Sequence, residues 1–126
     1  MPPRSYQLRE GVPAMSLPAE IEPAEAAAVL AETAAASCLL LDCRTSEEYA
    51  TAKIERARLI PMQELPERLA EIEAWRDQRI IVHCHHGVRS LRVTNWLRER
   101  GFDQAQSLRG GIEAWSRDVD PAVPTY

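Results

Sequence analysis

The chain has 126 residues, of which 45% are hydrophobic, and a formal net charge of -4. This length favours one domain with a single core, and the acidic balance argues against a general surface for nucleic acid or for an anionic membrane. No segment is long and apolar enough to span a bilayer, and the first residues lack the apolar core of a secretory signal peptide. The three cysteines, an odd number, give no disulfide framework, so we expect a reducing, cytoplasmic setting.

The N-terminal part of the chain predicts an arm followed by a packing helix. Residues 1–18 are rich in proline and show no sustained hydrophobic period, so we expect an arm without catalytic residues. We expect the folded domain over residues 19–118. Within it, Pro23 fits the first turn of a helix, and the residues that then share one helical face are Ala26, Val29, Leu30 and Thr33.

Strand and helix patterns alternate in the next segments. Residues 38–42 form a nearly continuous apolar run, typical of a strand buried on both faces of a parallel sheet. Thr45 and Glu48 have the spacing of a capping box, which predicts a short helix through Tyr49. Residues 57–60 are a weaker strand candidate.

The same alternation continues to the C-terminal part. Helical spacing follows at Leu65, Leu69 and Ile72, and the later segments are a strand over 79–83, a helix over 90–100, a strand over 104–108, a helix entered through Gly110 and Gly111, and a tail over 119–126. This order predicts an α/β fold with a central parallel sheet of about five strands and helices on both faces. In such sheets, ligands bind beyond the carboxyl ends of the strands.

Cys84 lies at one of these strand ends and is the best candidate nucleophile. All three histidines of the chain lie next to it or two residues away. Five residues separate Cys84 from the predicted helix at Ser90. A helix start has unpaired backbone N–H groups and the positive end of the macrodipole, which favour a thiolate over a thiol.

The loop after Cys84 has the residue types of an anion-binding nest. Gly87 can adopt a positive φ and let several N–H groups converge, and Arg89 adds a permanent charge beside them. His85 and His86 can supply neutral donors or further positive charge. We therefore expect residues 85–90, which include Val88 and Ser90, to bind the anion that Cys84 carries.

Three other readings of the loop need to be weighed. A lone cysteine at a strand end is more often an inert buried residue, although Gly87 and Arg89 argue against that here. A zinc site is a second reading, but consecutive residues such as Cys84, His85 and His86 do not readily surround one tetrahedral ion, and no other cysteine–histidine cluster exists. We expect no metal. His83 alternates with Cys84 and so should face the other way, as a packing residue.

A cysteine-dependent phosphatase is the third reading. Its signature is a cysteine, five residues and an arginine, whereas here Arg89 comes one residue early and Ser90 stands in the arginine position. A tighter loop suits a single sulfur atom better than a tetrahedral phosphate, so we expect no phosphatase activity.

Three stretches taken together resemble the rhodanese family of sulfurtransferases, in particular its single-domain bacterial members. They are residues 39–44 with 47–49 (LLLDCR, EEY), residues 84–90 (CHHGVRS), which match the active loop, and residues 108–115 (LRGGIEAW). Residues 52–57 depart from the family, because AKIERA stands where Gly-His-Ile-Pro-Gly-Ala is usual.

The resemblance implies that Cys84 takes sulfane sulfur from thiosulfate or a persulfide donor and passes it, as a persulfide, to a thiol or cyanide acceptor. It implies no cofactor, small-molecule substrates and, as an open alternative, a non-catalytic persulfide carrier for a partner protein. Asp42 and Arg44 should support the site, with Arg44 paired to Glu47 or Glu48. Cys43 should lie near the loop as a small apolar residue.

Overall fold

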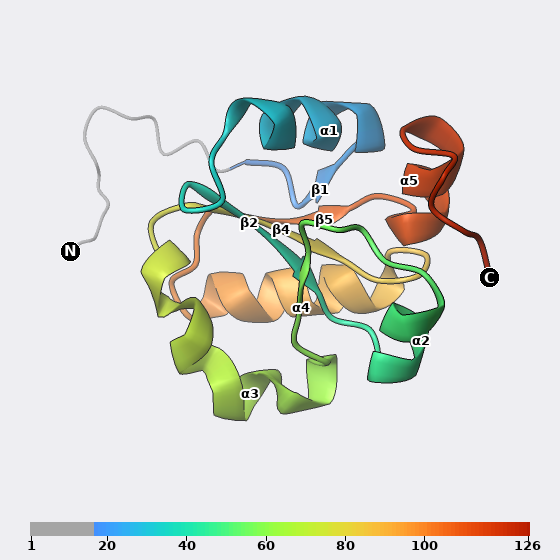
Figure 1. Ribbon diagram of the computed structural model, residues 1–126. Coiled ribbons are helices and arrows are strands. Elements are labelled where there is room, and N and C mark those ends of the chain that lie inside the picture. Colours follow the sequence, from blue (N-terminus) through green and yellow to red (C-terminus); the bar gives the residue numbers. More distant parts are fainter. Residues whose placement is uncertain (1–16) are drawn as a thin grey trace.

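The structure, a computed structural model, describes residues 17–126 (Figure 1). In chain order the elements are β1 (Glu20–Ile21), α1 (Pro23–Glu32), β2 (Cys38–Asp42), α2 (Ser46–Thr51), β3 (Arg58–Leu59), α3 (Leu65–Arg68), β4 (Arg79–His83), α4 (Val88–Glu99), β5 (Ala105–Leu108) and α5 (Gly111–Asp118). Two 3-10 segments, Met62–Glu64 and Leu69–Trp75, flank α3. No helix in this described part is long and apolar enough to cross a bilayer.

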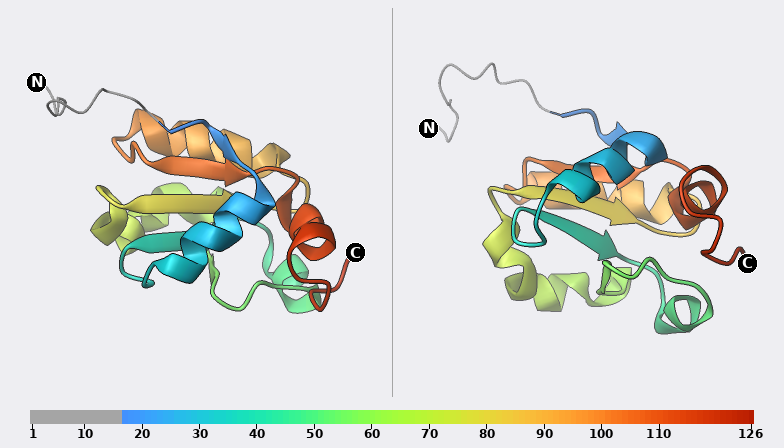
Figure 2. Two further views of the ribbon diagram at one scale, coloured as in Figure 1. Left: turned by 90° about the horizontal axis from the view of Figure 1, so that it is seen from above. Right: turned by 45° about the horizontal axis from the view of Figure 1, so that its top comes forward.

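The described strands form one sheet in the order β1-β5-β4-β2-β3, and every pairing is parallel. Helices α1 and α5 cover one face, and α3 and α4 cover the other (Figures 1 and 2). The predicted α/β fold with helices on both faces is therefore confirmed. In the register of β2 with β4, Asp42 pairs with His83, so both strands end at the same level.

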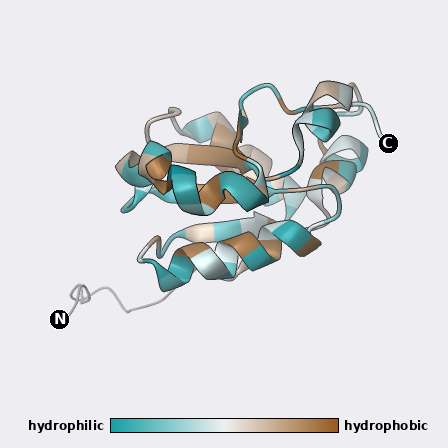
Figure 3. Ribbon diagram, turned by 90° about the horizontal axis from the view of Figure 1, so that it is seen from below, coloured by the Kyte–Doolittle hydropathy of each residue, from teal (hydrophilic) through white to brown (hydrophobic). Residues whose placement is uncertain are grey.

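Strand β2 is apolar along its length because both of its faces are buried. Leu40 belongs to the core cluster under α1 and α5, whereas Leu39 and Leu41 belong to the cluster under α3 and α4. Figure 3 shows the result, since a strand between the helices is brown while the helices alternate between teal and brown. Burying one leucine side chain contributes about 1.5–3 kcal/mol to the free energy of folding, so this strand anchors both layers.

The largest differences from the sequence expectation concern two helices. Helix α4 begins at Val88, two residues before the predicted start at Ser90, because Gly87 takes a left-handed conformation (φ 103°) and serves as the N-cap. The helix predicted from Leu65 to Ile72 is α-helical only to Arg68 and continues as a 3-10 helix. The predicted capping box of α2 is confirmed, since Thr45 and Glu48 make both of its hydrogen bonds.

The two ends of the described chain pack against the domain. β1, which the sequence analysis did not predict, pairs with β5, and the carbonyl oxygens of Leu17 and Pro18 accept hydrogen bonds from Arg98. The rest of the predicted arm, residues 1–16, lies outside the described residues. In the segment read as a tail, Val123 is buried, and its carbonyl oxygen accepts a hydrogen bond from the Ser116 hydroxyl at 2.6 Å.

Candidate active site

Cys84 directly follows β4 at the carboxyl edge of the sheet, and it is only 1% exposed. Cys43 follows β2 at the same level, and its backbone N–H donates to the carbonyl oxygen of His83 at 3.1 Å. The parallel register thus places the two cysteines side by side. Nothing in the sequence pattern of residues 38–43 alone distinguishes this position of Cys43 from an ordinary core position.

Three polar groups converge on the sulfur of Cys84. The backbone N–H groups of Gly87 and Ser90 lie 3.1 and 3.3 Å from Sγ, and the Ser90 hydroxyl lies 3.4 Å from it. The Ser90 hydroxyl in turn lies 2.7 Å from the hydroxyl of Ser107, on β5. The left-handed backbone at Gly87 turns its N–H inward, as the sequence analysis expected of this glycine.

These contacts make Cys84 the acidic thiol of the site. Its pKa is lowered to about 4, chiefly by interaction with the Cys43 thiol and then by the Ser90 hydroxyl and the two backbone N–H groups, against the opposing effect of burial. The pKa of Cys43 is raised well above its ordinary value by interaction with Cys84 and by burial. Burial also raises the pKa of Cys38, within β2. A thiolate is therefore favoured at Cys84 alone of the three cysteines.

Arg89 contacts a carboxylate rather than the thiolate. Its two terminal nitrogens donate to the carboxylate oxygens of Glu48 at 2.8 and 2.9 Å, and this pairing holds the pKa of Glu48 well below its ordinary value. Within the described residues, no hydrogen bond joins Arg89 to Cys84. The guanidinium thus acts on the sulfur only through its charge, and Glu48 keeps it beside the loop.

The predicted partner of Arg44 is wrong. Arg44 is fully buried and binds Asp42 through two nitrogens, at 2.9 and 2.7 Å, instead of the side chain of Glu47 or Glu48. A further nitrogen lies 3.4 Å from the backbone carbonyl oxygen of Glu48. Asp42 is the partner of Arg44 because it is buried in the same place, where an unpaired carboxylate would destabilise the fold.

Tyr126 contacts the site from the segment that was read as a tail. Its hydroxyl accepts a hydrogen bond from Arg44 and donates one to Glu48, both at 2.9 Å. Its ring stacks on His85, with ring centroids 3.9 Å apart and planes inclined by 9°. The sequence did not predict these contacts, because Tyr126 lies 78 residues from Glu48 and 82 residues from Arg44 along the chain.

His85 and His86 point toward Glu113, in the first turn of α5. The Nε2 atom of His86 lies 2.7 Å from a carboxylate oxygen of Glu113, and that of His85 lies 3.8 Å from the same oxygen. The start of α5 is held against the loop by the N–H of Ile112, which donates to the carbonyl oxygen of Cys84 at 2.8 Å. A Cβ at Gly111 would overlap the carbonyl group of His85, so only glycine permits this close approach.

His83, the last residue of β4, is fully buried. Neither ring nitrogen has a hydrogen-bond partner among the described residues, and Nε2 lies 3.7 Å from Asp42. Burial lowers its pKa, so the ring is neutral. Val88, by contrast, is 70% exposed at the outer edge of the loop.

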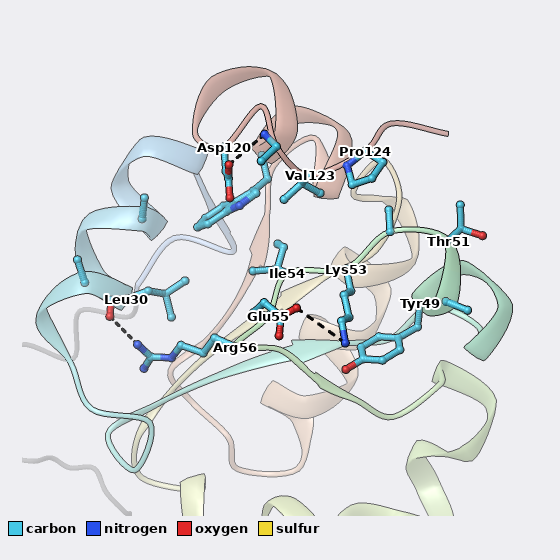
Figure 4. A pocket seen from close by; sticks show the side chains of 16 residues that line it. Leu30, Tyr49, Thr51, Lys53, Ile54, Glu55, Arg56, Asp120, Val123 and Pro124 are labelled. Atoms are coloured by element: carbon cyan, nitrogen blue, oxygen red, sulfur yellow. Dashed lines mark hydrogen bonds and ion pairs between the residues drawn. The ribbon is translucent and has the colours of Figure 1, made fainter.

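A separate groove lies away from Cys84, between α1, the segment after α2 and the C-terminal segment (Figure 4). Residues 52–56, where the sequence departs from the rhodanese pattern, form one wall. Arg56 turns away to the end of α1, where it donates to carbonyl oxygens of Leu30 and Thr33. No residue of the loop after Cys84 lines this groove.

Comparison with known proteins identifies the family. The profile described as "Rhodanese-like domain" matches residues 22–118, most of the chain. The chain belongs to the rhodanese-like family. The crystal structure of a rhodanese-like domain protein from Staphylococcus aureus is 30% identical, with a TM-score of 0.70 over 85% of this chain and 97% of that one.

Two curated relatives of this rhodanese-like chain carry sulfurtransferase in their names. A sulfurtransferase of Allochromatium vinosum is 39% identical over 85 residues, which are 68% of this chain and 78% of that protein. The adenylyltransferase and sulfurtransferase MOCS3-1 of Zea mays is 39% identical over 93 residues, which are 70% of this chain and 20% of that protein. The chain thus spans about a fifth of the length of the plant relative.

Proposed function

We propose that this chain is a sulfurtransferase in which Cys84 carries the transferred sulfur. The observation behind the proposal is the cradle around Cys84 Sγ, where two backbone N–H groups and one hydroxyl lie within 3.4 Å. Such fixed donors stabilise a negative sulfur without reorganising during the reaction. Membership of the rhodanese-like family and the names of its relatives support the same chemistry.

The proposed reaction is a double displacement with small-molecule substrates. The Cys84 thiolate attacks the outer sulfur of thiosulfate; a new S–S bond forms, the S–S bond of thiosulfate breaks, and sulfite leaves with the electron pair. With a persulfide donor, a thiolate leaves instead. An acceptor thiolate or cyanide then attacks the outer sulfur of the persulfide, and the Cys84 thiolate is released. The two steps need no cofactor.

The same contacts argue against a phosphatase. Arg89 is paired with Glu48, and Ser90 stands where a phosphatase has its arginine, so no guanidinium of the loop after Cys84 is free to hold the oxygens of a phosphate. The donors converge on one sulfur atom. An enzyme of the thiosulfate type therefore fits the loop better than an aryl-phosphate hydrolase.

The second candidate is a persulfide carrier for a partner protein. The observation that favours it is the burial of Cys84, which is 1% exposed and would hold a persulfide away from competing acceptors. A carrier and an enzyme share the first half of the reaction. They differ in how fast the second half proceeds with a free acceptor.

Thiosulfate with cyanide as acceptor tests the proposal. We expect one added sulfur atom on the peptide that contains Cys84, followed by the formation of many thiocyanate molecules per chain. Cys84→Ser should lose both, and Cys38→Ser, within a buried strand, is the matched control that should keep both. One sulfur per chain without turnover would favour the carrier. Persulfide on Cys38 or Cys43, or full activity in Cys84→Ser, would refute the role of Cys84.

A further inference from the structure

His85, His86 and Glu113 form a cluster that the sulfur chemistry does not use. Each offers one ligand atom, the two Nε2 atoms and a carboxylate oxygen, and these atoms all lie within 4.8 Å of one another. Two of the residues come from the loop after Cys84 and the third from the first turn of α5. We propose that these three side chains bind a divalent transition-metal ion, with zinc as the expected ion, beside the loop after Cys84. The sequence analysis expected no metal because it weighed the two histidines together with Cys84, whereas the third ligand here is Glu113, which lies 27 residues from His86 along the chain.

The spacing fits one ion after small movements. Two ligand atoms on a tetrahedral zinc ion lie about 3.3 Å apart, given Zn–N and Zn–O bonds of about 2.0–2.2 Å. The contacts from Glu113 to His86 and to His85, at 2.7 and 3.8 Å, lie on either side of that value. The movable side chains are His86 and Glu113, which are 59% and 44% exposed, whereas His85 is 20% exposed and stacked on Tyr126.

His85 also provides a ring nitrogen, Nε2, that lacks a hydrogen-bond partner among the described residues. This atom is buried, although it faces the Glu113 carboxylate. A buried polar nitrogen without a partner is costly, and a metal ion would satisfy it. The rings of His85 and His86 are already inclined by 25° rather than parallel, with centroids 3.8 Å apart. The unpartnered atom is thus aimed into the proposed site.

The donor set selects a cation of intermediate softness. Imidazole nitrogens suit zinc, copper and nickel, and a carboxylate adds negative charge, whereas calcium and magnesium prefer ligand sets made of oxygen. Glu113 also argues against the alternative that the two histidines bind an anionic sulfur donor, because its carboxylate faces both Nε2 atoms. Three protein ligands leave a coordination position open for a water or a substrate atom.

Such an ion would connect the loop to α5 and hold His85 in place. The catalytic loop must admit a sulfur donor to a cysteine that is 1% exposed. An ion that ties His85 and His86 to Glu113 would restrict this admission, so bound zinc should slow sulfur transfer. This effect on the rate rests on the proposed function, whereas binding of the ion does not.

The test titrates cobalt(II) into the untagged full chain that carries Cys84→Ser. This substitution removes the acidic thiolate, which could otherwise bind the ion. We expect one equivalent of cobalt to bind with the visible absorption of a four-coordinate site, without thiolate charge-transfer bands, and zinc to displace it. His86→Ala and Glu113→Gln in this background should each weaken binding by about tenfold or more. Glu99→Gln is the control, because Glu99 is exposed on α4.

Unchanged cobalt binding in His86→Ala and Glu113→Gln, or no binding by the starting protein, would overturn the proposal, as would charge-transfer bands that assign the ion to cysteine. Both side chains are on the surface, and circular dichroism of each variant verifies its fold. In wild type, zinc should slow thiosulfate:cyanide transfer reversibly, with less effect in Glu113→Gln. Because binding is measured in a variant that lacks Cys84, failure of the metal site and failure of the sulfurtransferase proposal are distinguishable.

Discussion

Cys84 owes its acidity to neighbours that act at different ranges along the chain. Gly87 and Ser90 are close in sequence, and a glycine before a helix start predicts that their N–H groups converge. Cys43 is 41 residues away from Cys84 along the chain and acts only because two parallel strands end together. The candidate nucleophile and its loop were therefore predictable from residues 84–90, whereas only the family resemblance placed Cys43 near the loop, and it did so as a small apolar residue rather than as the main cause of the low pKa.

Ionisation of Cys84 should make stability depend on pH. Its pKa is about 4 in the folded chain and near the ordinary 9.0 in the unfolded chain. Between these values the unfolded chain holds a proton that the folded chain lacks, so this stabilisation is fully present above pH 9 and is lost as the pH falls toward 4. The slope approaches about 1.4 kcal/mol per pH unit.

Urea unfolding at several pH values between about 5 and 8 measures this effect. We expect the difference in free energy of unfolding between wild type and Cys84→Ser to grow as the pH rises. Limiting iodoacetamide near neutral pH should also label Cys84 before Cys38 or Cys43. Parallel stability curves for the two proteins would mean that Cys84 is not ionised in the folded chain.

Tyr126 should stabilise the fold through its hydroxyl group. Tyr126→Phe keeps the ring that stacks on His85 but removes the hydrogen bonds to Arg44 and Glu48. Because Tyr126 is 38% exposed and water can replace the lost partner, we expect a loss of about 1 kcal/mol in the free energy of unfolding. Tyr49→Phe is the matched control, since the Tyr49 hydroxyl has no hydrogen bond in the described part of the chain. Equal stability of the two variants would contradict this assignment.

At the scale of elements, strands β2 and β4 were the easiest to predict. The apolar run of β2 and the run of β4 were confirmed with the expected bounds, because burial on both faces leaves a continuous apolar pattern. β1 has two residues, too few to show any period. Leu65, Leu69 and Ile72 have helical spacing, but that spacing does not distinguish an α-helix from the 3-10 helix that follows Arg68.

The paired ends of β2 and β4 predict a disulfide between Cys43 and Cys84 under oxidation. Neighbouring strands lie about 4.8 Å apart, within the Cα separations that a disulfide bridges. Peroxide would oxidise the Cys84 thiolate to a sulfenic acid, and attack by the Cys43 sulfur would then form the S–S bond and release water.

Peptide mapping after limited peroxide treatment checks for this link. We expect a peptide pair joined through Cys43 and Cys84 in wild type and in Cys38→Ser. In Cys43→Ser the oxidation of Cys84 should proceed to the sulfinic acid instead. Oxidation of Cys84 alone in wild type would show that Cys43 serves only in packing.

At the scale of the whole molecule, the site is assembled from segments that the sequence keeps apart. Glu48 lies 41 residues from Arg89, and Glu113 lies 27 residues from His86. A pattern search finds local motifs, so it identified the loop but assigned Glu48 to a helix cap and to pairing with Arg44, and Glu113 to a signature. These contacts depend on the parallel order of the strands, which brings α2, the loop and α5 to one edge of the sheet.

The near-complete burial of Cys84 has a consequence for which molecules react with it. A reactant reaches the sulfur only if its reacting end is narrow, and the terminal sulfur of thiosulfate or of a hydropersulfide is one atom wide. In the proposed persulfide, the second sulfur is bonded to Cys84 Sγ at about 2.05 Å, within the same loop. Under the proposed function, this burial selects sulfur donors by the shape of their reacting end, and it restricts the access of acceptors to the persulfide in the same way.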